Sequence, residues 1–483
     1  MMFDNQNTES IAPLVHEKSV EILFETGFCV PDTPTLTRLE AAEFIVDRDT
    51  QMVRVPPQIL ETALSNLPKK VKLYDRSGDT PIPYDQHSCF MGAGTPVNVL
   101  DLESGMRRSA TREDVVQLVT IQDALPMVDI VRPTVTATDL GDYSDLVEIA
   151  ELLRNTNKPV VHRVLTPERV EPAVEMLAAV AGGENALRAH PNFATLYCPI
   201  SPGYFTPENI GCMLRWAEYG VPITLLSMAM GGASAPVTLL GELIVINCDI
   251  LAWIAALETL YPGTPLLYGS VSAVLDMRTG LLPLGAPERG MINSGAAIMA
   301  HYYGLPAMCG GLSSDAKQLD SQAGTEKVLT ALPLLKERAE IIYGVGATDA
   351  GSSISYTQMV LDNEIIAGLR RMLQGWGEHQ VDQEVALIKA NTPRGNFLKE
   401  NHTRENYDQH WQPELFSRDA YETWQEKGAT IESLCRQKAK DILASHQPEP
   451  LPAKVEAELE LILRRYAGSD FSLDGKKNEV IYL

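Results

Sequence analysis

Short apolar runs alternate with longer amphipathic segments between about residues 86 and 375. Strands buried in a parallel sheet are apolar on both faces, and long connections, usually helices, join them. The alternation therefore predicts a series of strand–helix units. Eight runs fit this pattern: SCFMGAGTPVNVLD, MVDIVRPTVTATD, KPVVHRVL, NFATLYCPISPG, VPITLLSMAMGG, TPLLYGSVSAVLD, PAMCGGLSS and AEIIYGVGATDAG.

The segments between these runs have the length of helices, and several start at a residue that favours a helix N-terminus. Eight such units predict a closed (βα)8 barrel, the TIM barrel of the α/β class, with an open doubly wound sheet as the alternative. No GxGxxG opens a strand–helix unit, so dinucleotide binding has no support. The predicted helices start at Thr111, Tyr143, Pro167, Pro207, Val237, Pro287, Ser321 and Thr357.

Residues 1–85 depart from this pattern and predict an N-terminal appendage of helices and a short strand. We expect a helix from Ser10 to Glu25, because serine favours the N-cap position. A second helix follows Asp32, the run QMVRVPP predicts a strand, and Pro57 opens a third helix.

Residues 376–483 predict a C-terminal helical appendage. A polar, aromatic stretch precedes two helical runs, Ile431–Ser445 and Ala453–Tyr466. We expect this appendage to pack on the barrel or to supply contacts in a homo-oligomer. Most soluble oligomers are assemblies of identical chains. The closing stretch DFSLDGKKNEVIYL predicts no element.

The overall charge narrows the classes of partner. The chain has 40 Lys and Arg against 63 Asp and Glu, a net charge of −23, which argues against nucleic acid and anionic membranes. Its seven cysteines include no CxxC pair, as expected for reduced thiols in the cytoplasm. The start of the chain, MMFDNQNTES, lacks the features of a secretory signal. The apolar stretch Val237–Tyr261 contains Glu242 and Asp249, so we interpret it as a buried helix rather than a membrane span.

The segment Pro306–Glu326 is the strongest candidate for a functional loop. It starts as a buried strand, passes through Gly310 and Gly311, and ends in a polar cluster that includes Asp315 and Lys317. Catalytic groups in parallel α/β folds lie in the loops that follow the strands, and glycine lets a ligand approach the backbone. An ordinary loop with solvated polar residues is the alternative interpretation.

Other predicted strand ends are rich in tyrosine and carboxylate. Aromatic faces with nearby carboxylates suit a desolvated cation, at about 0.5–2 kcal/mol per contact. Tyrosines that merely span the core and the solvent would leave the same pattern. The histidines show no HExxH or Cys/His spacing, so we predict no tightly bound metal. Lys317 could instead be a Schiff-base lysine of a barrel lyase or aldolase.

Four blocks of the chain resemble one family. YGSVSAVLDMRTG, SSDAKQLDSQAGTEK, IYGVGATDAG and HTRENYDQHWQPELFSRDAYETW are similar to the trimethylamine methyltransferase family. The resemblance implies a (βα)8 barrel that passes a methyl group to the cobalt of a corrinoid, which a separate small protein carries. The founding trimethylamine enzymes place pyrrolysine near the loop that here reads GLSSDAK, with ordinary residues only. Relatives without pyrrolysine demethylate quaternary amines such as glycine betaine, proline betaine or carnitine, and we expect one of these substrates.

The resemblance and the strand-end positions together suggest roles for eleven residues. Aromatic rings would surround the cationic amine, carboxylates would balance its charge, basic groups would hold a substrate carboxylate, and glycines would leave room for the corrinoid face. The expected catalytic residues are Asp315, Lys317 and Asp349, with Lys317 also able to hold the carboxylate. The expected substrate-binding residues are Phe205, Tyr268, Tyr343, Tyr356, Arg132 and Arg163, and the expected corrinoid-facing residues are Gly310 and Gly311.

Three other functions stay open from the sequence. A tertiary amine such as trimethylamine could replace the quaternary amine as substrate. A lyase or aldolase could use Lys317 as a Schiff base. A non-catalytic protein could bind a betaine without transferring its methyl group.

Overall fold

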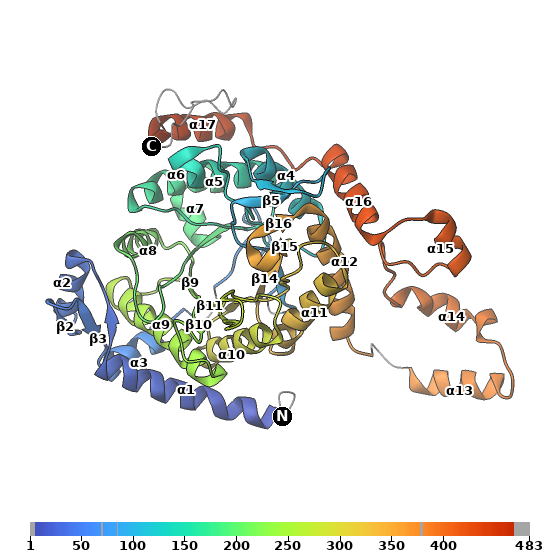
Figure 1. Cartoon of the computed structure of the whole chain (residues 1–483), viewed down its shortest axis with the longest axis horizontal. Coiled ribbons are helices and arrows are strands. Elements are labelled where there is room, and N and C mark those ends of the chain that lie inside the picture. Colours follow the sequence, from blue (N-terminus) through green and yellow to red (C-terminus); the bar gives the residue numbers. More distant parts are fainter. Residues whose placement is uncertain (1–4, 69–70, 85, 377–379, 468–483) are drawn as a thin grey trace.

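The computed structural model describes residues 5–68, 71–84, 86–376 and 380–467 (Figure 1). Its central element is a parallel sheet that winds around an enclosed interior, here called the lumen, with helices on the outside (Figure 1). The strands follow the order β4, β14, β13, β11, β9, β8, β7. Their bounds are Cys89–Gly92 for β4, Val160–Val161 for β7, Phe193–Tyr197 for β8, Ile223–Ser227 for β9, Leu266–Ser270 for β11, Ala307–Gly310 for β13 and Ile341–Val345 for β14.

The eighth position of the barrel is a very short extended segment. Ile130 forms a parallel bridge with Met91 of β4, and Val131 forms one with Val160 of β7, so the segment closes the sheet on itself. The predicted strand in MVDIVRPTVTATD is reduced to these two bridges. It ends early because proline at position 133 cannot donate a ladder hydrogen bond, and Thr134 has a positive φ of 60°. The structure thus confirms the (βα)8 barrel.

Helices follow the barrel strands as the sequence predicted. Thr111 caps α4 in a capping box with Asp114, and Asp320 caps α11 by accepting the N–H of Ala323. Gly220 and Gly304 end α8 and α10 in the left-handed conformation that favours glycine. The outer helices are α4 (Arg112–Ala124), α5 (Ser144–Asn155), α6 (Val170–Ala181), α7 (Glu184–Ala189), α8 (Pro207–Tyr219), α9 (Leu239–Leu260), α10 (Pro287–Tyr303), α11 (Ser321–Lys336) and α12 (Tyr356–Leu373).

Side chains alternate between the lumen and the outer helices along each barrel strand. A separate apolar cluster fills the lumen, with Leu196, Leu226 and Met308 among its members, while Val71 and Leu73 join it from the segment that precedes β4. A second, larger cluster packs between the strands and the helices. The lumen is therefore a packed core for most of its depth, and only its carboxyl end is available for a ligand.

Two small sheets extend the barrel beyond the carboxyl ends of its strands. One joins β10 (Met230–Gly231) and β12 (Ala273–Val274) in parallel. The other has the order β15, β16, β5, β6, with bounds Ala347–Thr348, Ser353–Ser355, Asn98–Leu100 and Arg107–Ser109. Both sheets hold loops in place around the mouth of the barrel.

The N-terminal elements pack against the side of the barrel. They are α1 (Asn5–Glu25), α2 (Thr33–Ala41), α3 (Pro57–Asn66) and a sheet of β1 (Phe28–Cys29), β3 (Met52–Arg54) and β2 (Ile45–Asp47). The first helix begins at Asn5, so the prediction that Ser10 starts it was wrong. The polar residues before Ser10 continue the helix, because polar side chains are also tolerated inside helices. By length and composition α9 could cross a membrane. However, about 67% of its most apolar stretch is buried inside the protein, where α1 and α3 pack against the helix.

The C-terminal elements first lead away from the barrel and then return to it (Figure 1). The C-terminal arm, residues 381–427, carries α13 (Val381–Asn391), α14 (Asn401–Asn406) and α15 (Tyr421–Lys427). After it, α16 (Ile431–Ser445) packs on α4 and α12, and α17 (Ala453–Ala467) packs on α6. The closing stretch DFSLDGKKNEVIYL lies outside the described residues.

Candidate functional site

Arg132 follows the short eighth barrel segment and is almost completely buried, with 3% of its surface exposed. Gln122 of α4 fixes its backbone: the side-chain amide donates to the Arg132 carbonyl at 2.7 Å, and the amide oxygen accepts the Arg132 N–H at 3.2 Å. The guanidinium lies over the Tyr343 ring, with 5.1 Å between the central carbon and the ring centroid. Its Nε and Nη1 atoms have no hydrogen-bond partner among the described residues. A buried cation with free donors is costly unless an anion pairs with it.

Arg163 lies near Arg132 on the same side of the lumen. It comes two residues after Val161, a member of the lumen cluster, so strand alternation places it on the lumen face. The charges of both arginines act on the thiol of Cys198, which directly follows β8. Burial raises the pKa of Cys198, and the positive charges of Arg163 and then Arg132 oppose that rise. The two predicted carboxylate-binding residues are therefore brought together.

Arg289 is a third arginine at the same end of the lumen, although it belongs to a helix. It lies in the first turn of α10 with only 2% of its surface exposed. Its Nη1 donates to the Val271 carbonyl at 2.8 Å, while Nε has no partner among the described residues. Burial lowers the pKa of Arg289 to about 10, so the group remains charged at neutral pH, and the nearby Tyr343 and Asp315 favour that charge.

The predicted catalytic residues lie in two linked loops at the rim of the mouth. The N–H of Asp349 donates to the Ala316 carbonyl at 2.8 Å. Lys317 is 69% exposed; its Nζ donates to the Asp315 carbonyl at 2.6 Å and lies 3.6 Å from Asp349 Oδ1. Arg107 adds a second cation 3.3 Å from Asp349 Oδ2. Lys317 and Asp349 thus form a solvent-facing ion pair rather than part of the lumen.

Asp315 is more enclosed than its neighbours in the loop. Its Oδ1 accepts the N–H of Leu284 at 2.7 Å, and burial raises its pKa. It lines an open cavity of about 790 Å³ at the rim, together with Asp276, Glu288 and Glu326. Four carboxyl groups of the mouth therefore lie in this side cavity, apart from the buried arginines of the lumen.

Three predicted aromatic residues lie outside the lumen. The Tyr268 hydroxyl donates to Asn247 of α9 at 3.0 Å, and Phe205 packs edge-to-face on Trp253 of the same helix. The Tyr356 hydroxyl donates to Asp114 of α4 at 2.7 Å. Of the four predicted rings, only Tyr343 is in contact with the lumen cluster.

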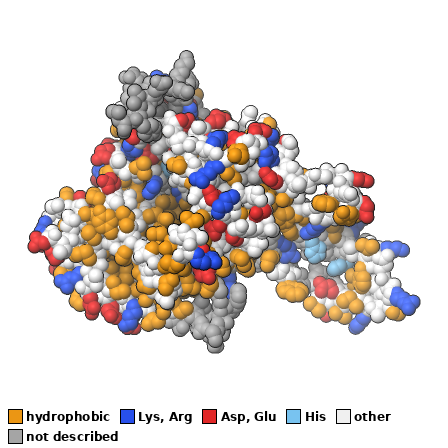
Figure 2. Space-filling view, viewed as in Figure 1, with side chains coloured by type: hydrophobic (Ala, Val, Ile, Leu, Met, Phe, Trp, Pro, Cys, Tyr) orange, Lys and Arg blue, Asp and Glu red, His pale blue; other side chains and the backbone are white. Residues whose placement is uncertain are grey.

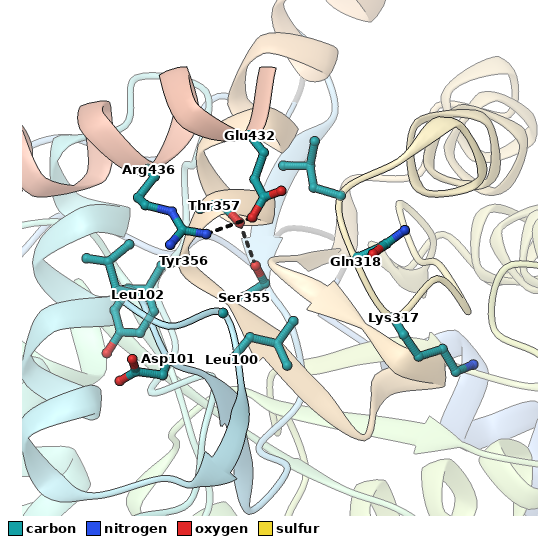
Figure 3. A pocket seen from close by; sticks show the side chains of 12 residues that line it. Leu100, Asp101, Leu102, Lys317, Gln318, Ser355, Tyr356, Thr357, Glu432 and Arg436 are labelled. Carbon is teal, nitrogen blue, oxygen red and sulfur yellow. Dashed lines mark hydrogen bonds and ion pairs between the residues drawn. The ribbon is translucent and has the colours of Figure 1, made fainter. Parts of the chain in front are cut away.

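Figure 3 shows the surroundings of Tyr356 beneath α16, beside a cavity of about 50 Å³ that has room for a few water molecules. Lys317 lines the far side of this cavity and points away from it (Figure 3). Neither residue is therefore placed where it could touch a ligand bound in the lumen.

The structure gives Gly310 and Gly311 a packing role. A Cβ at Gly310 would lie 2.5 Å from Arg289 Nη2, and a Cβ at Gly311 would lie 2.5 Å from Leu334 and 2.9 Å from the Thr330 carbonyl. The space that we expected to be open for a corrinoid is filled by this chain's own atoms. Gly310 admits Arg289, and Gly311 admits α11.

Exposed apolar side chains lie along one side of the mouth. Each lies in a segment that follows the carboxyl end of a barrel strand or of its short extension. Figure 2 shows hydrophobic side chains gathered over one face of the barrel and, separately, on the C-terminal arm. The apolar rim consists of Leu165, Ile200, Met228, Val237, Met277 and Leu281. Exposed apolar surface of this kind is typical of protein–protein contact sites.

One group of side chains in the described part of the chain has the spacing of a metal site. His87, Cys89 and Asp129 lie close together at the amino end of the barrel, away from the mouth. The guanidinium of Arg370 donates to Asp129 Oδ2 at 2.6 Å and supplies a cation there already. Because Cys89 is the first residue of β4, this cluster lies at the opposite end of the barrel from the lumen arginines.

Sequence reasoning missed Arg289 because the residue lies on a helix rather than at a strand end. Its signal in the sequence was indirect: Gly310, at the end of a buried strand, leaves space that another side chain fills. No pattern along α10 distinguishes Arg289 from a surface arginine.

A (βα)8 barrel with charged groups at the carboxyl ends of its strands has the architecture of an enzyme. The family model described as trimethylamine methyltransferase (MTTB) matches residues 2–469, so the chain belongs to this family of methyltransferases.

Two relatives illustrate the range of names in the family. The trimethylamine methyltransferase MttB of Desulfitobacterium hafniense (strain DSM 10664 / DCB-2) is 32% identical over 93% of this chain and 91% of its own length. The glycine betaine methyltransferase of Desulfitobacterium hafniense (strain Y51) is 28% identical over 94% of this chain and 96% of its own length. Among solved structures, the Methanosarcina barkeri monomethylamine methyltransferase matches with a TM-score of 0.46 and 13% identity, over 90% of this chain and 93% of that one.

Proposed function

We propose that this protein transfers a methyl group from a betaine-type quaternary amine to the cobalt of a corrinoid, which a separate small protein carries. Family membership supports methyl transfer from a methylated amine. A full-length relative is named as a glycine betaine methyltransferase. The loop GLSSDAK consists of ordinary residues, as in family members that lack pyrrolysine.

The unpaired guanidinium of Arg132 is the observation that carries the choice of a betaine. Trimethylamine has no anionic group for a buried arginine to bind. A betaine has a carboxylate, which accepts strong charge-assisted hydrogen bonds from a guanidinium. The Arg132 guanidinium covers one face of the Tyr343 ring, so the trimethylammonium group would contact the opposite face.

A quaternary amine needs little chemistry from the protein beyond positioning. Its nitrogen leaves as a neutral tertiary amine, so no acid has to supply a proton. The corrinoid supplies the nucleophile that accepts the methyl group. In this proposal the lumen arginines orient the carboxylate, and Tyr343 faces the methylated nitrogen.

The methyl acceptor approaches from the mouth, which is the open end of the lumen. The apolar rim lies along one side of this entrance and provides a contact surface for the protein that carries the corrinoid. Gly310 and Gly311 do not take part in that contact, because Arg289 and α11 occupy the space beside them.

A lyase or aldolase function of Lys317 has little support from its surroundings. A Schiff-base lysine is activated by desolvation or by a neighbouring cation. Lys317 is 69% exposed and lies beside the carboxylate of Asp349, which stabilises the charged amine.

The test is methyl transfer from a substrate panel to free cob(I)alamin, followed by the visible spectrum of methylcobalamin. The panel contains glycine betaine, proline betaine, carnitine, γ-butyrobetaine, choline and trimethylamine. We expect transfer from a carboxylate-bearing quaternary amine and little from choline or trimethylamine. Transfer from trimethylamine alone would contradict the proposal and favour the tertiary-amine alternative. No transfer from any compound, with a corrinoid protein also supplied, would contradict both.

A further inference from the structure

The C-terminal arm consists of short helices that lack a core of their own. The structure describes every residue from 381 to 427, and none of them is buried. The helices α13, α14 and α15 span 11, 6 and 7 residues. Isolated helices shorter than about 12–15 residues are marginal in water, and packing provides most of the stability of helices in proteins. The arm therefore needs cover from outside itself.

The barrel of the same chain supports the arm at one place, residues 411–416. The N–H of Leu415 donates to Glu364 of α12 at 3.1 Å, and the Trp411 ring lies 3.4 Å from the position that a Cβ at Gly368 of that helix would take. The helix α13 lies away from the barrel (Figure 1). The support at residues 411–416 thus leaves most of the arm uncovered.

The uncovered surface of the arm is apolar and rich in aromatic rings. On α13, exposed Val381, Val385 and Ile388 have the spacing of one helix face. The other exposed large apolar residues of the arm are Phe397, Leu398, Tyr407, Phe416, Tyr421 and Trp424. These nine side chains expose on the order of 1,000 Å², whereas each partner of a standard protein–protein interface contributes about 800 Å². The arm alone therefore carries enough surface for a stable interface.

A second exposed apolar surface lies where α12 ends. It consists of Met372, Leu373 and Trp376 and is here called the α12 patch. Trp376 is 93% exposed, although tryptophan is a residue that interfaces favour. The arm of the same chain leaves this patch uncovered. One chain thus presents two uncovered apolar surfaces, the arm and the α12 patch.

We propose that the C-terminal arm packs on the α12 patch of a second copy of this chain, in a symmetric exchange of arms. In a twofold pair every contact occurs twice, so each arm covers the patch of the other copy. A partner that binds only transiently would leave the arm exposed whenever it dissociates, whereas a second copy gives lasting cover. This inference does not depend on the proposed function.

The test measures the mass of the full-length protein in solution by analytical ultracentrifugation. The arm variant is Val385→Glu with Ile388→Glu, which places two carboxylates on the apolar face of α13. The patch variant is Trp376→Glu. The matched control is Met106→Glu with Leu461→Glu, which adds the same charge as the arm variant at two exposed apolar residues outside the arm and the patch.

We expect the wild type and the control to have the mass of two copies or of an even multiple. The arm variant and the patch variant should each weaken the pairing by about 100-fold or more and sediment as monomers, because carboxylates do not fit an apolar contact. A mixture of the two variants should pair again, since one intact arm then meets one intact patch. That recovery would also show that both variants fold.

Three results would overturn the exchange of arms. A wild type that stays monomeric, or that forms trimers, would exclude a symmetric pair. An arm variant that pairs as tightly as the wild type would show that α13 lies outside the contact. Two monomeric variants whose mixture also stays monomeric would show that the arm and the α12 patch do not meet across the pair.

Discussion

Glu242, in the first turn of α9, is a buried carboxyl group with neither oxygen hydrogen-bonded to a side chain or backbone group of the described residues. Its Oε2 lies 2.7 Å from the position that a Cβ at Gly231 would take, so the group packs directly against the backbone of β10. Burial raises its pKa from the usual 4.5 to about 7. The backbone N–H of Gly231 opposes this rise, but burial is the larger effect and favours the neutral carboxyl group.

Glu242→Gln should make the protein less sensitive to pH and more stable in mild alkali. Because the pKa is raised in the folded state, the folded protein keeps a proton between pH 4.5 and about 7 that the unfolded chain has lost. The stability that this provides is fully present below pH 4.5 and is lost as the pH rises through 7. A shift of this size corresponds to at most ~3.4 kcal/mol in the free energy of unfolding.

The measurement is the melting temperature of both proteins between pH 5 and pH 8. We expect the wild type to lose stability across this range and the glutamine variant to lose less, with the largest difference at pH 8. Parallel curves for the two proteins would contradict the prediction.

At the scale of elements, a buried ion pair joins α11 and α12 behind the mouth. Lys327 Nζ lies 2.7 Å from Asp362 Oδ2, and both side chains are fully buried. The pair also binds the backbone after Tyr343: Lys327 donates to the Gly344 carbonyl at 3.2 Å, and Asp362 accepts the N–H of Gly346 at 2.7 Å. The ion pair thus fixes the end of β14, which carries Tyr343.

Lys327→Met should destabilise the fold strongly, because it leaves the Asp362 carboxylate buried without its partner. We expect a loss of ~3–5 kcal/mol in the free energy of unfolding, measured by urea denaturation. The double variant Lys327→Met, Asp362→Leu should recover much of this loss. Lys440→Ala, which breaks an exposed pair with Glu103, is the control and should cost less than ~1 kcal/mol. Equal losses for Lys327→Met and the control would refute a structural role for the buried pair.

At the scale of the whole molecule, only one end of the barrel is open to a ligand. The lumen is closed below by packed side chains, so a ligand can enter it only through the mouth. The apolar rim lies along one side of that mouth, while the C-terminal arm carries its own exposed hydrophobic residues at a distance from the barrel (Figure 1).

Carboxylates introduced on the apolar rim should slow methyl transfer to a protein-bound corrinoid but not to free cob(I)alamin. We expect Met277→Glu with Leu281→Glu to slow methyl transfer to the corrinoid protein by ~10-fold or more, because apolar contact is lost. Transfer to free cob(I)alamin should remain as in the wild type. Leu398→Glu, on the C-terminal arm, is the control and should affect neither rate. Equal slowing with both acceptors would place the rim residues in the reaction itself rather than in docking.

Much of the fold follows from local patterns. The starts of α8, α10 and α11 at Pro207, Pro287 and Ser321 are where helix-start signals predicted them. Of the site, Arg132, Arg163 and Tyr343 were predicted from their positions at strand ends, and these are the predicted residues that meet at the lumen. Their roles stay predictions that the experiments above test.

Which side of the sheet a residue faces could not be read from the sequence. Tyr268 and Tyr343 occupy similar runs, YGSV and YGVG, yet one faces α9 and the other the lumen. Strand side chains alternate with period two, so a shift of one residue in register exchanges the two faces. The register depends on pairing with other strands, which no single run contains.

The sequence by itself determined the alternation of apolar strands with helices and the caps that start several of the helices. These features depend on residues that are neighbours along the chain. Only the tertiary structure decided the composition of the site. Arg289 and Gly310 are separated in the chain, and their contact exists because α10 packs across the gap between β11 and β13. A site built from such contacts is determined by packing, which is a property of the whole fold.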